Sequence, residues 1–516
     1  MLNFSSISLA NTKVKYTAFA VAYVVALMLY WPGLSGVPVW DDITFWFFDP
    51  VMRPTFPYAE IWKNFTWPFS VSLQKFFFNL FHTRYWIYHS INFALHAFNS
   101  WLVFRLLLLM RLKIGLAFAG FVLFLLHPAC VITVAWMVQL KTLVCFTFAI
   151  GALIIYLQRG SSRRMIFSYV LYLFSILSKS ASLPLPLVML FFIEKPVFRK
   201  QNLAIIPFFL ICAFGAYRIN YSHLAVTAVK DALETTGKGI PKKAIQERQE
   251  EEVQGGEEFT PLSDEPLVKS TERFEPQDVG YRPSQEGQAA VEPTKTLVEL
   301  SPFAAKRRLF IKTLYYYFWQ AYTPMNNAPV KGQNPYPPSV WDYLHLIFLC
   351  ILILISVRFY FFYFLAAAHI FLLPYFGWIP APYMNVTWVS DQHLYIALPF
   401  FLGAFLTIMG HLKFKWRPLL VALLALFFII KTREAVPYYK NNTAFYGASI
   451  DHNFNNIPLV YNLAMIYISE GKRQEAIDLL ELIFSVSKSE VYLRENKFFP
   501  YLLHLHGQLK QNEEAK

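Results

Sequence analysis

The sequence predicts an all-α polytopic membrane protein with about eleven transmembrane helices and a small helical tail at its C-terminal end. The composition supports this class, because 56% of the 516 residues are hydrophobic and only 15% are charged. In a soluble domain, about a quarter of the residues are charged. Several apolar runs also approach the ~20 residues that an α-helix needs to cross a bilayer.

The expected spans are defined by their hydropathy and length. They cover residues 16–36, 86–108, 114–130, 142–157, 165–180, 183–194, 202–218, 341–357, 359–376, 394–411 and 417–432. The first run is expected to be a retained anchor rather than a cleaved signal peptide, because it lacks a small-x-small cleavage site and further spans follow. The span at 183–194 is short and contains Pro184 and Pro186.

Basic loops predict the orientation, because cytoplasmic loops of membrane proteins carry an excess of Lys and Arg. Short basic loops lie at 111–113, 158–164, 195–200 and 411–417. Two of them, 158–164 and 195–200, must lie on the same side, which requires an even number of spans between them and supports the short span. Parity then predicts a cytoplasmic N-terminus and a C-terminus on the outer face. These loops also explain the net charge of +13, since no nucleic-acid-binding module accompanies it.

The chain divides into four expected regions. They are an N-terminal transmembrane part with the first outer loop (1–218), a hydrophilic outer loop (219–302), an interfacial segment followed by the last spans (303–432), and an outer tail (433–516). The hydrophilic loop is expected to be flexible, because it has too few large apolar residues to offset the entropy of ordering. The Tyr- and Trp-rich segment 310–322 is expected to lie along the membrane interface.

The tail contains the spacing of a tetratricopeptide helix pair at residues 461–484. Gly471 is expected to terminate the first helix, and a Leu-rich second helix follows Ala476. Because single repeats stabilise one another only by stacking, we expect one repeat and a degenerate second one. An ordinary amphipathic helical hairpin is the alternative.

Two adjacent carboxylates, Asp41 and Asp42, directly follow the first span on its expected outer side. Like charges repel, so the pKa of one of them is expected to rise unless a cation neutralises the pair. One Asp is explained by a helix N-cap. A pair at the membrane edge indicates a general base, a metal ligand or both.

The expected second span carries a polar stripe. His89 and His96 are seven residues apart and therefore share one helix face. Polar groups inside a membrane must face the bundle interior, where they form interhelical hydrogen bonds or line a substrate groove. The four cysteines fall in apolar runs and show no metal-binding spacing or disulfide framework.

Four further segments carry motif-like residues in a fixed order along the chain. They are YHSINFALHAFNSWLVFRL, LLHPACVITVAWMVQLKTLV, LSKSASLPLPLV and SDQHLYIALP. With the outer acidic pair and the tail, they resemble the GT-C glycosyltransferases, and most closely the transmembrane, tetratricopeptide-repeat-containing O-mannosyltransferases and their bacterial relatives. The sequence departs from that pattern at Leu140, Ser180 and Gln392, where the family usually has Arg, Glu and Arg.

The resemblance implies a GT-C bundle that moves a sugar from a polyprenyl- or dolichyl-phosphate carrier to a hydroxyl acceptor, usually with inversion. It implies that Asp41 or Asp42 removes the acceptor proton. Cations at the outer span ends would hold the leaving lipid phosphate. Lys141, Lys179 and Arg84 are the candidates, and the alternative for each is contact with lipid headgroups.

The same resemblance implies that further residues line the substrate groove. These are His89, His96, His127, Asp391, His393 and Tyr395. No cofactor is expected to be required. The three aspartates could cradle a divalent cation, but the mannosyltransferase-like relatives imply catalysis without a metal.

The expected partners are a polyprenyl-phosphate-linked sugar donor, a protein or glycan acceptor and membrane lipids, but no nucleic acid. Protein O-glycosylation is the favoured function, with the tail binding polypeptide. The alternatives are the same chemistry on a lipid-linked or cell-envelope glycan, and a non-enzymatic membrane-anchored scaffold. The short tail favours a bacterial inner membrane with the active site and C-terminus in the periplasm. The endoplasmic reticulum membrane is the alternative location.

Overall fold

A computed structural model of the chain describes most of the helical parts. The described residues are 12–43, 45–46, 49–158, 161–192, 203–219, 302–325, 327–331, 340–356, 361–376, 387–412, 415–452, 456–487 and 499–514. Within these ranges all regular secondary structure is helical, which confirms the all-α class. The expected hydrophilic loop falls almost entirely outside the described residues.

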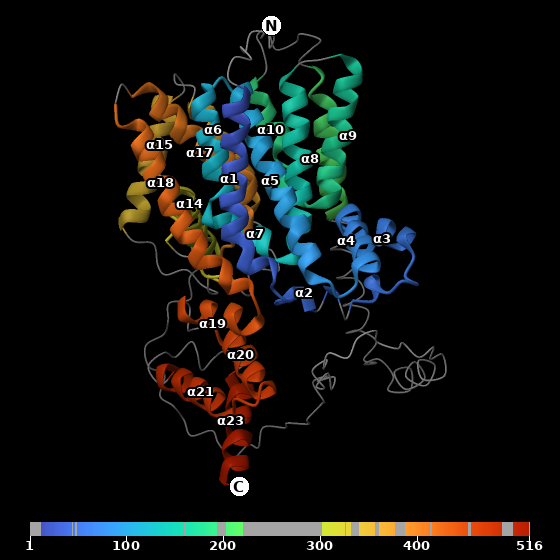
Figure 1. The fold of residues 1–516 in the computed structure, drawn as a ribbon, viewed down its shortest axis with the longest axis vertical. Coiled ribbons are helices and arrows are strands. Elements are labelled where there is room, and N and C mark those ends of the chain that lie inside the picture. The colour runs from blue at the N-terminus through green and yellow to red at the C-terminus, as the bar shows by residue number, and fades with distance from the viewer. Residues whose placement is uncertain are drawn as a thin grey trace. The chain divides into compact units, whose positions relative to one another are not determined.

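Four helices in the described ranges are long and apolar enough to cross a membrane (Figure 1). They are α1 (Thr12–Leu34), α5 (Tyr85–Leu109), Met137–Leu157, which contains α8 (Leu140–Leu157), and Asp391–His411, which contains α17 (Leu394–His411). A fifth span would join α6 (Ile114–Leu125) to Pro128–Ala135 through a 51° bend. The membrane class is thereby supported, while the count of eleven spans stays a prediction.

Other helices lie at the remaining expected span positions. They are α9 (Ser162–Ser178), the apolar stretch Ser180–Phe192, the helix Ile206–Ile219, α15 (Val340–Ser356), α16 (Phe361–Leu372) and α18 (Arg417–Ala435). The stretch Ser180–Phe192 is broken into short turns, since its α-helical part, α10, covers only Leu185–Met189. Proline lacks the N–H that a continuous helix needs, and Pro184 immediately precedes α10.

One hydrophobic core holds the bundle together. It joins buried residues of α5, α6, α8, α9, α16 and α17. Small residues permit the close approach of these helices. A Cβ added at Gly403 would lie 2.3 Å from the ring of Phe364 and 3.1 Å from Leu107. The helix α14 (Pro302–Tyr322), expected at the interface, places Leu314 and Tyr317 in this same core.

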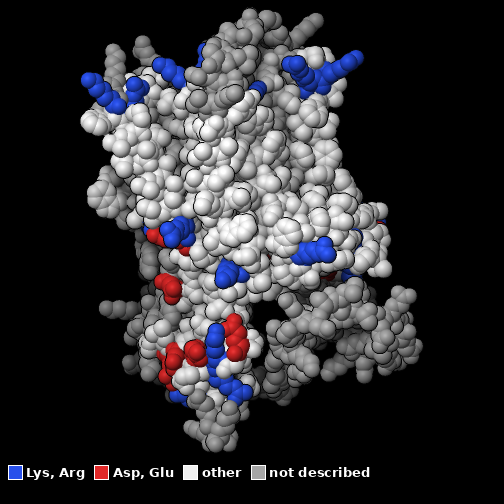
Figure 2. All heavy atoms as spheres, viewed as in Figure 1, with Lys and Arg blue, Asp and Glu red and all other residues white. Residues whose placement is uncertain are grey.

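The surface of the bundle also matches a membrane protein. Figure 2 shows a wide band on this face in which the described residues carry no Lys, Arg, Asp or Glu, with basic side chains at both ends of the band. An apolar belt between charged ends is what a bundle presents to lipid.

The segment after α1 forms short helices beside the bundle. They are α2 (Asp41–Ile43), η3 (Pro50–Met52), α3 (Tyr58–Asn64) and α4 (Pro68–Phe81). Lys75 of α4 is buried and donates to the carbonyl oxygen of Val51 over 3.0 Å. Arg218 donates to the carbonyl oxygens of Trp62 and Phe65 at 2.9 and 2.6 Å. These contacts fix the segment to the helix ends around it.

The C-terminal tail is helical, and its buried residues share one hydrophobic core with Tyr30 of α1, Val39 and Trp136. After η11 (Val436–Tyr439) it contains α19 (Asn442–His452), α20 (Ile457–Ser469), α21 (Arg473–Ser487) and α23 (Phe499–Glu514). Gly471 lies between α20 and α21 with a φ of +75°, a conformation that favours glycine. Lys472 closes the turn by donating its N–H to the carbonyl oxygen of Tyr467 over 2.8 Å. The helical hairpin is present, and its assignment as a tetratricopeptide repeat stays a prediction.

Candidate functional site

Asp42 is fully buried at the start of α2, where two backbone amides hold its carboxylate. Its Oδ2 accepts from the N–H of Val39 at 3.2 Å, and its Oδ1 accepts from the N–H of Val138 at 2.8 Å. Burial raises the pKa of Asp42 to about 7, against the opposing effect of these hydrogen bonds. The carboxylate therefore ties the segment after α1 to the turn before α8.

Asp41 is the exposed member of the pair. Desolvation by the surrounding protein raises its pKa, while the positive charge of Lys141 and a hydrogen bond from Trp40 lower it. A carboxylate that is accessible and more basic than usual is suited to accept a proton. The sequence did not distinguish the two aspartates, but the structure gives them different environments.

The residue before the pair has an unusual backbone conformation. Trp40 has a φ of +50°, in the left-handed region that costs a bulky residue roughly 1–2 kcal/mol. Its N–H donates to Oδ1 of Asn442 at 3.1 Å. Strain of this kind persists only where surrounding contacts maintain it.

Two lysines lie near the acidic pair. Lys141 interacts electrostatically with both Asp41 and Asp42, and its Nζ lies 5.7 Å from the centroid of the Trp67 ring. Lys179 is buried and donates from Nζ to Oγ1 of Thr142 at 2.7 Å. The two lysines repel each other. Among the described residues, Lys179 forms no ion pair with a carboxylate, so an anion would be favoured beside it.

Arg84, the third expected phosphate ligand, is not joined to these lysines. It lies exposed at the N-cap of α5. Its side chain makes no hydrogen bond or ion pair with the described part of the chain. The alternative that the sequence left open, contact with lipid headgroups, fits this position better.

His96 and Tyr395 belong to a buried network between helices. His96 Nδ1 lies 2.9 Å from the hydroxyl of Tyr395, and its Nε2 lies 3.1 Å from the carbonyl oxygen of Leu125. Asn99 donates to the same Tyr395 hydroxyl at 3.3 Å and accepts from Oγ1 of Thr147 at 2.6 Å. Every polar atom of this network has a partner in a neighbouring helix, which favours interhelical hydrogen bonding over a substrate groove.

His127 and His89 are also buried. Nε2 of His127 lies 3.1 Å from the carbonyl oxygen of Ala321, and its Nδ1 accepts from the N–H of Ala129 at 3.1 Å. His127 thus connects the break after α6 to α14. Neither ring nitrogen of His89 has a well-formed hydrogen bond, although the backbones of Gly36 and Ala135 lie nearby.

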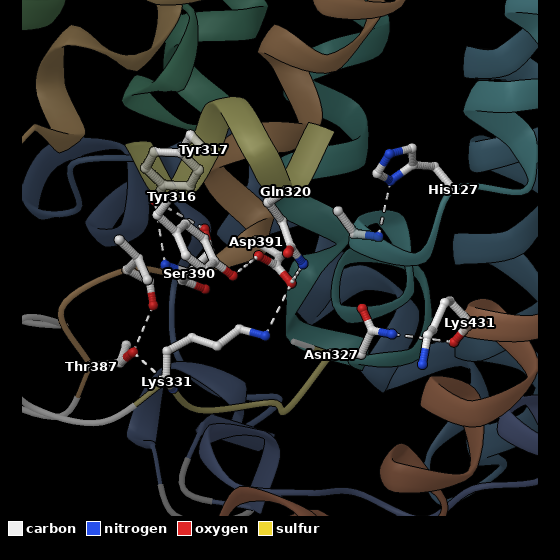
Figure 3. A network of polar contacts seen from close by, with 12 residues as sticks. His127, Tyr316, Tyr317, Gln320, Asn327, Lys331, Thr387, Ser390, Asp391 and Lys431 are labelled. Carbon is white, nitrogen blue, oxygen red and sulfur yellow. Dashed lines mark hydrogen bonds and ion pairs between the residues drawn. The ribbon is translucent and has the colours of Figure 1, made fainter. Parts of the chain in front are cut away.

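Asp391 forms a second polar centre, which Figure 3 shows from close by. Lys331 forms a buried ion pair with Asp391 at 3.3 Å. Tyr316 donates to Oδ1 of Asp391 at 2.5 Å, and Gln320 donates to Oδ2 at 3.0 Å. Burial lowers the pKa of Lys331, and the charge of Asp391 opposes that shift.

His393 lies in the same short helical turn as Asp391. Its Nδ1 lies 3.2 Å from the hydroxyl of Tyr317, and its ring stacks on Tyr375 with centroids 3.8 Å apart. It also interacts electrostatically with Lys179. His393 thus lies within electrostatic reach of Lys179, although more than 200 positions separate them in the sequence.

The sequence interpretation missed Lys331, Tyr316 and Gln320. Tyr316 and Gln320 lie one turn apart on α14, so a helix-face argument could have grouped them. No local pattern marks Lys331. Among the described residues, no group of three or more His, Cys, Asp or Glu side chains could hold a metal ion.

The sequence was also compared with known proteins. No protein-family model matches it, and no curated protein matches it at a significant level.

Proposed function

We propose that the chain is a membrane glycosyltransferase of the GT-C type, which transfers a sugar from a polyprenyl- or dolichyl-phosphate carrier to a hydroxyl acceptor at the outer membrane face. The observation that carries the proposal is an exposed carboxylate, Asp41, next to a buried and anchored one, Asp42, within electrostatic reach of Lys141. The resemblance in motif order supports the same function.

Asp41 acts as the general base in this proposal. It removes the proton from the acceptor hydroxyl as the acceptor oxygen attacks the anomeric carbon of the sugar. The bond between that carbon and the carrier phosphate oxygen breaks, and its electron pair leaves with the phosphate. Asp42 does not touch the substrate in this scheme, because backbone amides occupy both of its oxygens.

Lys141 and Lys179 stabilise the leaving phosphate. Preorganised positive charge is effective where negative charge develops in the transition state. Thr142 and Gln139 orient the ammonium group of Lys179, at 2.7 and 3.5 Å. We propose that this pair, without Arg84, binds the carrier phosphate.

The number of spans, their orientation, the location and the acceptor are proposed from the sequence patterns. We propose an eleven-span bundle with a cytoplasmic N-terminus in a bacterial inner membrane, and a tetratricopeptide-like tail on the acceptor side. Protein is the favoured acceptor, because helical repeats of this kind bind polypeptide. The reaction as written needs no metal ion, although a divalent cation is compatible with it.

Glycan mass measured in cells tests this function. Secreted and membrane proteins are compared among cells with the wild type, a deletion, Asp41→Asn, and the control Asp49→Asn, which makes the same charge change in the same loop. We expect a defined sugar to be lost in the deletion and in Asp41→Asn, and kept in Asp49→Asn. If the sugar is lost from a lipid-linked or envelope glycan instead, that glycan rather than protein is the acceptor. If Asp41→Asn fully rescues the phenotype of the deletion, the catalytic role of Asp41 is rejected and the non-enzymatic scaffold function is favoured.

A further inference from the structure

The tail and the first outer loop are joined through their backbones. Val37 donates its N–H to the carbonyl oxygen of Lys440 at 3.0 Å. Trp40 donates its N–H to Oδ1 of Asn442 at 3.1 Å. Trp40 is the residue with the left-handed φ of +50°, directly before Asp41. The strained position is therefore one of the points at which the tail contacts the loop.

Aromatic packing from the tail holds the side chain of the same residue. The Trp40 ring stacks on Tyr446, with centroids 6.0 Å apart and an interplanar angle of 15°. It meets Phe445 edge-on at 5.2 Å and Trp136 at 6.4 Å. Trp136 precedes the Val138 amide that holds Asp42. One aromatic cluster thus joins the tail, the loop and the turn before α8.

Glycines allow the loop to approach the tail closely. A Cβ added at Gly36 would lie 2.8 Å from the carbonyl oxygen of Tyr439. A Cβ added at Gly33 would lie 3.0 Å from Cγ1 of Val436. Real Cβ atoms rarely come this near to backbone oxygen, so a larger residue at Gly36 would separate the two segments.

Tyr446 also lies within electrostatic reach of Asp41. The negative charge of Asp41 contributes to the raised pKa of Tyr446, after the larger effect of burial. The same side chain therefore stacks on Trp40 and interacts with the carboxylate of the next residue. Asp42, by contrast, is held by the loop and by the bundle.

We propose that the tail positions the general base: Asn442 and Tyr446 hold Trp40 in its strained conformation, and this conformation directs the carboxylate of Asp41 to the substrate side. The inference rests on the proposed function. Because Asp42 is anchored independently, a rotation at Trp40 would move Asp41 while leaving the rest of the turn in place. Asn442 and Tyr446 are positioning residues, since neither needs to touch the reacting atoms.

The test uses the full-length protein and three variants at the tail. Asn442→Ala removes the acceptor for the Trp40 N–H, and Asn442→Asp retains an oxygen at that position. The control is Asn441→Ala, because Oδ1 of Asn441 caps α19 by accepting from the N–H of Ala444 at 2.8 Å and does not contact Trp40. Amide hydrogen exchange of residues 37–43 and sugar-transfer kinetics are measured for each protein.

We expect Asn442→Ala to raise the exchange rate of this segment about tenfold or more. We also expect kcat to fall about tenfold while the KM for the lipid-linked donor stays within about twofold, because Lys141 and Lys179 are unaffected. Asn442→Asp should restore the slow exchange, and Asn441→Ala should change both readouts less than about threefold.

The exchange readout separates this inference from the proposed function. One result is that the wild type shows no transferase activity while Asn442→Ala still shows faster amide exchange. That result would support the contact between Asn442 and Trp40, and only the proposed glycosyltransferase function would be contradicted. Unchanged exchange and unchanged kcat in an active Asn442→Ala protein would overturn the inference. Equal losses in Asn442→Ala and Asn441→Ala would also overturn it, because the tail would then contribute only general stability.

Discussion

Val138 donates its backbone N–H to Oδ1 of Asp42 over 2.8 Å, although 96 positions separate the two residues. This bond joins the segment after α1 to the turn before α8. It also separates the roles of the adjacent aspartates, because Asp42 is fully buried while Asp41 remains exposed. The pair is therefore one anchored and one accessible carboxylate rather than two equivalent ones.

The anchor should make stability depend on pH. The pKa of Asp42 is raised from 3.8 to about 7, so between these values the folded protein binds more protons than the unfolded chain. The contribution of Asp42 to the free energy of unfolding should therefore decrease as the pH rises from about 4 to about 7, and change little above that range.

Thermal unfolding in detergent at a series of pH values measures this effect. The free energy of unfolding of the wild type minus that of Asp42→Asn should decrease between about pH 4 and pH 7, since only the wild type carries the titrating group. Asp49→Asn serves as the control and should retain the wild-type slope. An identical pH dependence in wild type and Asp42→Asn would show that Asp42 is not the group responsible.

Lys141 should set the acidic limit of activity. Its charge lowers the pKa of Asp41, against the larger effect of desolvation. In Lys141→Met, the pKa of Asp41 should rise further, and the acidic limb of kcat/KM should move to higher pH, because the base must be ionised. The measurement is a pH–rate profile of both proteins with a lipid-linked sugar donor. An acidic limb at the same pH in both proteins would contradict the electrostatic coupling between Lys141 and Asp41.

The ion pair between Lys331 and Asp391 should contribute to stability through charge compensation. Lys331→Met leaves the buried Asp391 without its cation, and removal of one partner from a buried pair costs about 3–5 kcal/mol. The double variant Lys331→Met/Asp391→Asn should recover part of this loss. Chemical denaturation of the three proteins measures it. A double variant less stable than Lys331→Met would argue against the pairing.

The hydroxyl of Tyr395 should be structural rather than catalytic. It bonds His96 and Asn99 between helices at 2.9 and 3.3 Å. Tyr395→Phe leaves buried partners unsatisfied and should cost about 1–3 kcal/mol of stability, with kcat changed less than about threefold. Unfolding midpoints and transfer rates are measured together. A large fall in kcat at normal stability would restore Tyr395 to the substrate groove, where the sequence placed it.

The long apolar helices were predictable because hydropathy and length suffice for them. The span expected at 86–108 is α5 (Tyr85–Leu109), and Gly471 ends α20 as expected for a residue that tolerates positive φ. The assignment of Asp41 and Asp42 to an active site also came from the sequence, through charge repulsion at a membrane edge, and it stays a prediction. These features depend on local residues alone.

The remaining features depend on contacts between distant segments. Nothing near Asp391 in the sequence indicates Lys331, which precedes it by 60 positions and reaches it only through the path of the chain after α14. The anchoring of Asp42 depends on a backbone amide, which carries no sequence pattern. The strain at Trp40 likewise depends on Asn442 and the tail.

The most direct test of the central claim is sugar transfer by the purified full-length protein. The assay measures release of polyprenyl phosphate from a polyprenyl-phosphate sugar in the presence of hydroxyl acceptors, for wild type, Asp41→Asn and Asp49→Asn. We expect acceptor-dependent release by wild type and Asp49→Asn, and a fall in kcat of about 10²–10⁴-fold in Asp41→Asn with an unchanged unfolding midpoint. Wild-type rates in a folded Asp41→Asn protein would contradict the assignment of Asp41 as the base.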